Sequence, residues 1–377
     1  MRPSKFFLIL VLTFSVSSTV AQATADEYYK RGNEHRRSGD RDAAIADYTK
    51  AIEVDPALAE AFMRRGALRG AKSDYDGAIA DNTRAIEINP NLAGAYVGRA
   101  AAFVLKGSRD EAISDATFAI RLDPNYAEAF RIRGLARLQK RDYKSALPDW
   151  DRAIELGITT APTYMNRAVA REGLSDFAGA IIDETTAIDI DPKFVPAYRN
   201  RALSRRSYGD YVGAITDYNK VLEFEPANKY MILGRAWTKL FMRDPDGAYQ
   251  DAKLFLAANG AKEGEGPYAV LITYIALRQS GKPTIAKTFL EHSISDLDAS
   301  YWPTKLLRLM AGQITQEQLL ESANNIEKLT EARTLIGEFF LLNGDNNNAA
   351  MHFRWVKENG NRDRITYQLA RTELGRL

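Results

Sequence analysis

Histidine and cysteine are the side chains that most often bind metals or attack substrates, and this chain has few of either. It has three histidines, His35, His292 and His352, and no cysteine. The histidines are too far apart in the sequence to form the close spacing of a zinc site, and a thiol nucleophile is excluded. We therefore predict no catalytic residue, no cofactor and no metal, and we expect the chain not to be an enzyme. An enzyme in the C-terminal part is kept as a weaker alternative.

Two other patterns that could carry chemistry do not hold. Ser280-Gly281-Lys282 is like the end of a phosphate-binding loop, but Ala276 replaces the required upstream glycine and Pro283 replaces the hydroxyl residue. Acidic residues are numerous, yet they recur at a fixed period. A pair of carboxyl groups that works as acid and base would be expected at one place only.

Arginine and aspartate form two regular series, each with a step of 34 residues. The series are Arg31, Arg65, Arg99, Arg133, Arg167, Arg201 and Arg235, and Asp47, Asp81, Asp115, Asp149, Asp183, Asp217 and Asp251. A charge near a packed seam needs a partner, and the planar guanidinium matches a carboxylate in geometry. We predict that each arginine pairs with an aspartate of the same or an adjacent repeat. The alternative is a basic stripe that binds an acidic ligand.

The elements that would position these charges repeat with the same step of 34 residues. Seven copies begin at residues 25, 59, 93, 127, 161, 195 and 229, and each has Gly or Ala at its eighth position and Ala at its twentieth. These small residues lie on two apolar-periodic segments, which are separated by breaks such as Gly39-Asp40. Each copy is therefore predicted to be a helical hairpin that must stack on its neighbours to bury its apolar face.

The copies resemble the tetratricopeptide repeat family. The resemblance rests on the small residues above, on an aromatic residue at the fourth position of six copies, and on a proline that closes five of them, as in Tyr28 and Pro56. It covers residues 25–260. It implies an all-α, right-handed solenoid of helical hairpins, with a concave groove lined by the first helix of each copy.

This groove is the candidate binding site. Its predicted partner-binding residues are Tyr29, Asn33, Arg36, Met63, Val97, Arg131, Met165, Arg199 and Arg206. They form a polar and basic end, a softer apolar floor and a second basic stretch. Binding of other proteins is the predicted use. A merely solvated surface, or binding of cell-wall glycan or peptide fragments, remains open. The same positions of copy seven, Leu233, Trp237, Leu240 and Phe241, are apolar, and we expect the C-terminal part to cover them.

The C-terminal region, residues 261–377, follows a glycine-rich joint at 257–267. Helical pairs are predicted at 268–279 with 283–292 and again from Thr330, with a capping box at Thr315 and Gln318 and a closing helix over 362–374. This region resembles the end of a periplasmic lipoprotein that carries tetratricopeptide repeats. The resemblance implies an adaptor whose partners are cell-wall hydrolases and a protease, although the lipid-bearing cysteine is missing.

The N-terminus has the pattern of a secretory signal peptide over residues 1–21. Arg2 and Lys5 precede an apolar run at 6–16, which is shorter than the ~20 residues that span a bilayer. We predict a cleaved signal, no stable membrane anchor and a periplasmic or secreted protein; an uncleaved anchor is the alternative. Without Arg2 and Lys5, 49 basic residues face 49 acidic ones, so nucleic acid is not an expected partner. The predicted function is an exported scaffold or adaptor for envelope proteins, of unknown oligomeric state.

Overall fold

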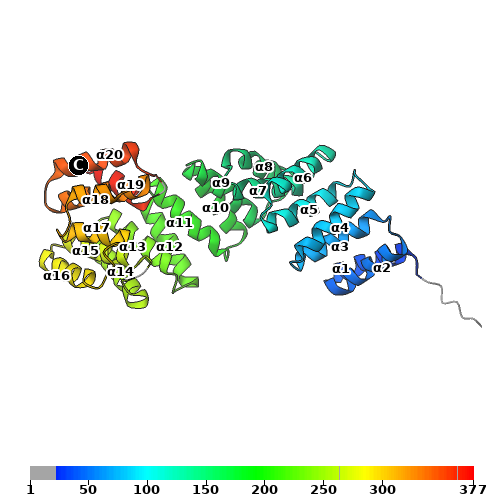
Figure 1. Cartoon of the computed structure of the whole chain (residues 1–377), viewed down its shortest axis with the longest axis horizontal. Coiled ribbons are helices and arrows are strands. Elements are labelled where there is room, and N and C mark those ends of the chain that lie inside the picture. The colour runs from blue at the N-terminus through cyan, green and yellow to red at the C-terminus, as the bar shows by residue number, and fades with distance from the viewer. Residues whose placement is uncertain (1–22, 263, 363) are drawn as a thin grey trace, which may run out of the picture. The chain divides into compact units, whose positions relative to one another are not determined.

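The computed structural model describes residues 23–262, 264–362 and 364–377. These residues form 21 helices and no strand, which confirms the predicted all-α fold of stacked helical hairpins (Figure 1). None of the helices in the described ranges is long and apolar enough to cross a membrane. The predicted signal peptide, residues 1–21, lies outside the described residues.

The chain divides into two compact units, residues 1–136 and 137–377. Unit 1 contains α1 (Ala25–Ser38), α2 (Arg41–Val54), α3 (Ala59–Ala71), α4 (Tyr75–Ile88), α5 (Ala93–Lys106), α6 (Arg109–Leu122) and most of α7 (Ala127–Gln139). This division reflects compactness, whereas the predicted bounds 25–260 and 261–377 follow the repeat phase and stay predictions.

Unit 2 contains two further groups of helices. The first group is α8 (Tyr143–Glu155), α9 (Ala161–Gly173), α10 (Phe177–Ile190), α11 (Val195–Tyr208), α12 (Tyr211–Phe224), α13 (Lys229–Phe241) and α14 (Pro245–Asn259). The second is α15 (Gly266–Gln279), α16 (Pro283–Ile294), α17 (Trp302–Met310), α18 (Gln316–Ser322), α19 (Ile326–Leu342), α20 (Asn346–Asn359) and α21 (Ile365–Leu374).

The helix boundaries follow the repeat. The first helix of every copy begins at the first residue of that copy, from Ala25 of α1 to Lys229 of α13. Between the two helices of a copy, one residue takes a left-handed conformation, as at Gly39 with φ 86° and Ser73 with φ 65°. In six copies an aspartate follows and caps the second helix, whereas copy three has Ser108 there without a side-chain cap. Asp40, for example, accepts a hydrogen bond from the backbone N–H of Ala43 at 3.0 Å.

Close helix contacts explain the small residues at the eighth position. A Cβ atom added to Gly32 would lie 2.8 Å from the ring of Tyr48, which is fully buried at the 24th position of the same copy. In copy two the 24th residue is Asn82, and it fits between Gly66 of its own copy and Gly98 of the next. The 24th side chain therefore needs small residues in the first helices on both sides of it.

The predicted pairing of arginine and aspartate is confirmed in the six copies that lie wholly inside one unit. In each, the arginine Nε and Nη2 atoms donate to both carboxylate oxygens in a bidentate pair, with distances from 2.5 to 3.0 Å. The pairs are Arg31–Asp47, Arg65–Asp81, Arg99–Asp115, Arg167–Asp183, Arg201–Asp217 and Arg235–Asp251. Except in copy one, Nη1 also donates to the preceding copy, as from Arg201 to Thr185 Oγ1 at 3.0 Å. The arginines thus connect neighbouring hairpins.

The C-terminal helices match the predictions with one exception. Helices α15, α16, α19, α20 and α21 occupy the predicted segments, and the capping box is present, because the backbone N–H of Thr315 donates to Gln318 at 2.9 Å and that of Gln318 to Thr315 at 3.2 Å. Helix α17 was not predicted. It has only nine residues and lies outside the repeat phase, although Pro303 suits its first turn.

The apolar face of copy seven is covered, as predicted. Leu233, Trp237, Leu240 and Phe241 are at most 6% exposed, and they share one core with residues of α15 and with Leu369 of α21. Unit 2 therefore closes its own apolar surface at this end.

Candidate functional site: the groove of unit 1

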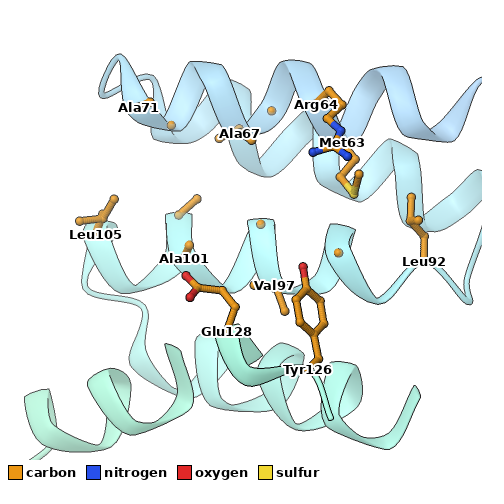
Figure 2. Close-up of a pocket in the computed structure, with 16 residues that line it drawn as sticks. Met63, Arg64, Ala67, Ala71, Leu92, Val97, Ala101, Leu105, Tyr126 and Glu128 are labelled. Carbon is orange, nitrogen blue, oxygen red and sulfur yellow. The ribbon is translucent and has the colours of Figure 1, made fainter. Parts of the chain in front are cut away.

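A hollow of about 490 Å³ lies between the first helices of copies two and three. We call it the groove pocket. Its lining comes from α3, α4, α5, the turns before α5 and α7, and the first turn of α7: Met63, Arg64, Gly66, Ala67, Gly70, Ala71, Ala78, Leu92, Gly94, Val97, Gly98, Ala101, Ala102, Leu105, Tyr126 and Glu128. Figure 2 shows Met63 and Arg64 toward one end of it, and Ala71 and Leu105 at the other. Arg64 thus lies away from the aliphatic end, whereas the carboxylate of Glu128 lies beside Ala101.

The pocket exists because five groove positions of these two copies carry glycine or alanine. Ala67, Gly70 and Ala71 occupy the ninth, twelfth and thirteenth positions of copy two, and Gly94 and Ala101 occupy the second and ninth of copy three. Copy one has Asn33, Arg36 and Arg37 at the same three positions, which would fill the space. The resulting floor is apolar and open.

Among the described residues, Arg64 is the charged group of the pocket that has no hydrogen-bond or ion-pair partner. Its side chain is partly buried, and its Nε atom is buried without a hydrogen bond. The other cation nearby, Arg131, is already occupied, because it donates to both oxygens of Glu128 at 2.8 and 2.5 Å. No carboxylate of the described residues neutralises Arg64. An acidic group brought by a ligand would meet an available guanidinium here.

The predicted groove residues of copy one gather around one buried tyrosine. Tyr48 donates a hydrogen bond from its hydroxyl to Asn33 Oδ1 at 2.9 Å, and its ring lies 5.8 Å from that of Tyr29. Burial raises the pKa of Tyr48, and the neighbouring Arg36 opposes that shift. Tyr29, Asn33 and Arg36 therefore form a polar cluster in α1. Of the other predicted residues of unit 1, Met63 and Val97 line the groove pocket.

The predicted groove residues of unit 2 do not form one cluster. Met165 and Arg199 are partly exposed on α9 and α11. Arg206 is bound within the unit, since it donates to Gln368 Oε1 of α21 at 3.0 Å and to the hydroxyl of Tyr218 at 3.1 Å. Gln368 in turn donates to Ser207 Oγ at 2.9 Å. The closing helix thus occupies the groove side of copy six at Arg206.

Sequence reasoning missed the residues that make the pocket: Arg64, Ala67, Gly70, Gly94, Ala101 and Glu128. The available signal was the absence of large side chains. A search for charged and aromatic residues at the groove positions does not detect glycine and alanine. Two neighbouring copies that are small at those positions predict a hollow, because the hairpin spacing is fixed by the repeat.

A buried pair of carboxyl groups lies in unit 2. Ser204 Oγ is 2.7 Å from Glu172 Oε1 and 3.1 Å from Glu184 Oε1, and Glu184 is fully buried with its Oε2 atom unpartnered. Burial and the neighbouring carboxyl of Glu172 raise the pKa of Glu184 to about 9. The pair therefore holds a proton at neutral pH.

The histidines show no common site. His352 is buried and stacks on Phe340, and burial lowers its pKa to about 4, whereas His35 lies 3.5 Å from Asp47. Across the part of the chain that the structure describes, no three His, Asp or Glu side chains are grouped so as to hold a metal ion.

The helices and their 34-residue step define an array of helical hairpins, with a hollow between the first helices of copies two and three. Two models of the tetratricopeptide repeat match the chain, at residues 25–58 and 98–162. The chain therefore contains tetratricopeptide repeats, a module that serves in protein–protein interaction scaffolds.

Similar solved structures include a tetratricopeptide repeat protein from Parabacteroides merdae ATCC 43184, which is 18% identical with a TM-score of 0.45 over 67% of this chain and 98% of that one. YrrB, a TPR protein, is 21% identical with a TM-score of 0.44 over 49% and 95%. PilF of Pseudomonas aeruginosa is 16% identical with a TM-score of 0.49 over 54% and 93%. No curated protein matches the chain.

Proposed function

We propose that this protein is an exported, non-enzymatic scaffold or adaptor that binds envelope proteins through the groove of its repeats. The observation that carries the proposal is the groove pocket, an apolar hollow of about 490 Å³ on the face of the first helices. The signal-like N-terminus supports export, and the resemblance of the C-terminal region to a periplasmic adaptor supports cell-wall hydrolases or proteases as partners.

The proposed occupant of the groove pocket is a segment of a partner protein that carries an acidic residue beside apolar side chains. Apolar side chains gain free energy by leaving water in the Gly/Ala-floored hollow, and a carboxylate would pair with Arg64. Arg64 lies at one end of the hollow and Leu105 at the other, so the segment would place its acidic residue near α3 and its apolar side chains beyond it.

Filling the hollow tests this proposal. Ala101→Phe places a large ring on the floor of the pocket, and Glu111→Phe places the same ring on the exposed side of α6 as a matched control. With the mature chain as bait in an envelope extract, we expect Ala101→Phe to lose the retained partner at least tenfold while Glu111→Phe keeps it. Equal retention by both variants, at unchanged helical content, would contradict the proposal.

A further inference from the structure

A second hollow, of about 440 Å³, lies in unit 2, and the scaffold proposal makes no use of it. We call it the aromatic pocket. Four aromatic side chains line it, Trp237, Tyr268, Tyr301 and Trp302, together with Glu265, Glu331 and Arg364. Its volume is in the range of small-molecule sites, roughly 300–1,000 Å³. Aromatic rings and a few polar groups are also the usual lining of such sites.

Two of the four rings of the aromatic pocket, Trp302 and Tyr268, are held by one buried carboxylate. Glu331 is 2% exposed, and its Oε2 atom accepts hydrogen bonds from Trp302 Nε1 at 2.6 Å and from the Tyr268 hydroxyl at 3.1 Å. Its Oε1 atom accepts from Arg364. Because these bonds use the ring edges, they fix the rings without occupying their faces. The Lys328 Nζ atom lies 5.4 Å from the centre of the Trp302 ring, so Lys328 covers one face of that ring.

Two polar groups of the aromatic pocket are available to a ligand. Among the described residues, the half-buried carboxylate of Glu265 makes no hydrogen bond or ion pair, so it can accept. Arg364 gives part of its fork to Glu331, but its side chain is 38% exposed and has further N–H groups to donate. A ligand in this hollow would therefore meet an acceptor and a donor beside aromatic surface.

The charge balance of the aromatic pocket indicates a neutral ligand. The lining carries two carboxylates and one guanidinium, which sum to one negative charge. Helices α15, α17 and α21 begin at this hollow, and none has a side-chain cap. Each N-terminus contributes about half a positive charge, so the three together, about 1.5, slightly exceed the one negative charge of the side chains. Neither a cation nor an anion gains much from such a site.

We infer that the aromatic pocket is a saccharide-binding site. A sugar ring presents apolar C–H faces that can lie on the aromatic side chains, and its hydroxyl groups can donate to Glu265 and accept from Arg364. It is neutral, polar at its edge and apolar on its faces, which matches the lining. This site lies outside the groove pocket and would give the scaffold a second, non-protein ligand.

A glycan array tests this inference with the full mature chain. The array should present oligosaccharides of hexoses, N-acetylhexosamines and uronic acids. We expect a defined subset to be retained, and titration followed by tryptophan fluorescence to give about tenfold weaker binding for Tyr301→Ala and for Glu265→Gln. The matched controls are Tyr208→Ala, an exposed tyrosine of α11, and Glu321→Gln, an exposed glutamate of α18, and both should bind as the parent chain does.

Three results would overturn the inference. The first is that no saccharide is retained by the parent chain. The second is equal binding by the pocket variants and their controls when circular dichroism shows all four folded. The third is that Nα-acetyl-lysine amide binds in a Glu265-dependent way, or acetate in an Arg364-dependent way, while saccharides do not bind, which would assign the pocket to an ion. Loss of protein capture in the Ala101→Phe variant tests the groove pocket separately.

Discussion

The buried ion pairs show what single residues contribute to this array. Asp217 is almost fully enclosed and faces two cations: it pairs with Arg201 at 2.8 Å and with Arg205 at 2.8 Å, and its side chain is 1% exposed. The arginines of these ion pairs bind aspartates of the chain itself, so they do not form a basic stripe for a ligand. Their regular spacing predicted them, because a charge that recurs with the repeat serves every repeat.

Removal of Asp217 should leave two partly buried arginines with weaker partners only, because Arg201 keeps Thr185 Oγ1 at 3.0 Å and Arg205 keeps Asp210 at 3.5 Å. For Asp217→Ala we expect a loss of about 3 kcal/mol in the free energy of unfolding. Glu87→Ala, which removes an exposed pair with Arg84, should cost roughly 0.5 kcal/mol or less. Denaturant melts measure both values. Equal small losses would mean that the aspartate series is effectively solvated.

The Glu172–Glu184 pair makes stability depend on pH. The pKa of Glu184 is raised in the folded state, so the folded chain keeps a proton that the unfolded chain has lost, and stability falls as the pH rises from about 4.5 to about 9. Glu184→Gln should reduce this slope by up to about 1.4 kcal/mol per pH unit and should be more stable than the parent chain at pH 8. Melts at pH 5, 6.5 and 8 test it; parallel slopes for the two chains would contradict it.

At the scale of the helix, contact distance decides which small residues are replaceable. Gly337 of α19 would place a Cβ atom 2.4 Å from the fully buried ring of Phe353 in α20, whereas Gly70 of α3 would place one at an ordinary 3.6 Å from Ala78. The repeat pattern predicted close contact at the eighth position, and Gly337 occupies that position in the degenerate pair. The repeat pattern alone does not predict how much space surrounds the glycines at other positions.

These two glycines give opposite predictions for the same substitution. Gly337→Ala should destabilise the chain by about 1–3 kcal/mol, because Phe353 cannot move without disrupting the core. Gly70→Ala should stabilise it by roughly 0.5 kcal/mol, because alanine is the better helix former and meets no clash. Thermal melts of the two variants compare them directly. Destabilisation of both by the same amount would show that helix packing is tight throughout.

The helices could be predicted from the sequence where the 34-residue repeat fixes their positions, and one helix outside the repeat could not be predicted. Every helix start of the seven copies was predictable, because small, large and capping residues recur together. Helix α17 was missed since its nine residues match no periodic template, and the groove pocket was missed since glycine and alanine give no positive signal. The ligand class of either pocket could not be predicted from the sequence. It depends on which polar atoms lack hydrogen-bond partners, and these atoms are known only from the contacts in the structure.

At the scale of the molecule, unit 2 closes its repeats with its own C-terminal helix. Leu369 of α21 packs in the same core as Phe241. The hydroxyl oxygens of Thr372 and Tyr211 lie 2.6 Å apart, and Glu373 pairs with Arg243 in the turn of copy seven. Terminal repeats need such a cover, because their outer apolar face would otherwise meet water. The groove pocket of unit 1 has no comparable cover among the described residues.

Removal of residues 365–377 should therefore loosen one part of the chain selectively. We expect faster hydrogen–deuterium exchange in α13 and α19, which lose buried contacts with α21, and unchanged exchange in α3 and α5 of unit 1. Unchanged exchange in α13 would show that the closing helix is not needed to stabilise copy seven.

The central claim is that the groove pocket holds a partner protein, and site-specific photo-crosslinking tests it most directly. A benzophenone side chain would be placed at Ala101, on the floor of the pocket, or at Glu111, on the exposed side of α6, and each chain would be irradiated in envelope extract. The account predicts a discrete protein adduct from position 101 that the Arg64→Gln change weakens, and none from position 111. Adducts from position 111 alone, or the same adducts from both positions, would contradict it.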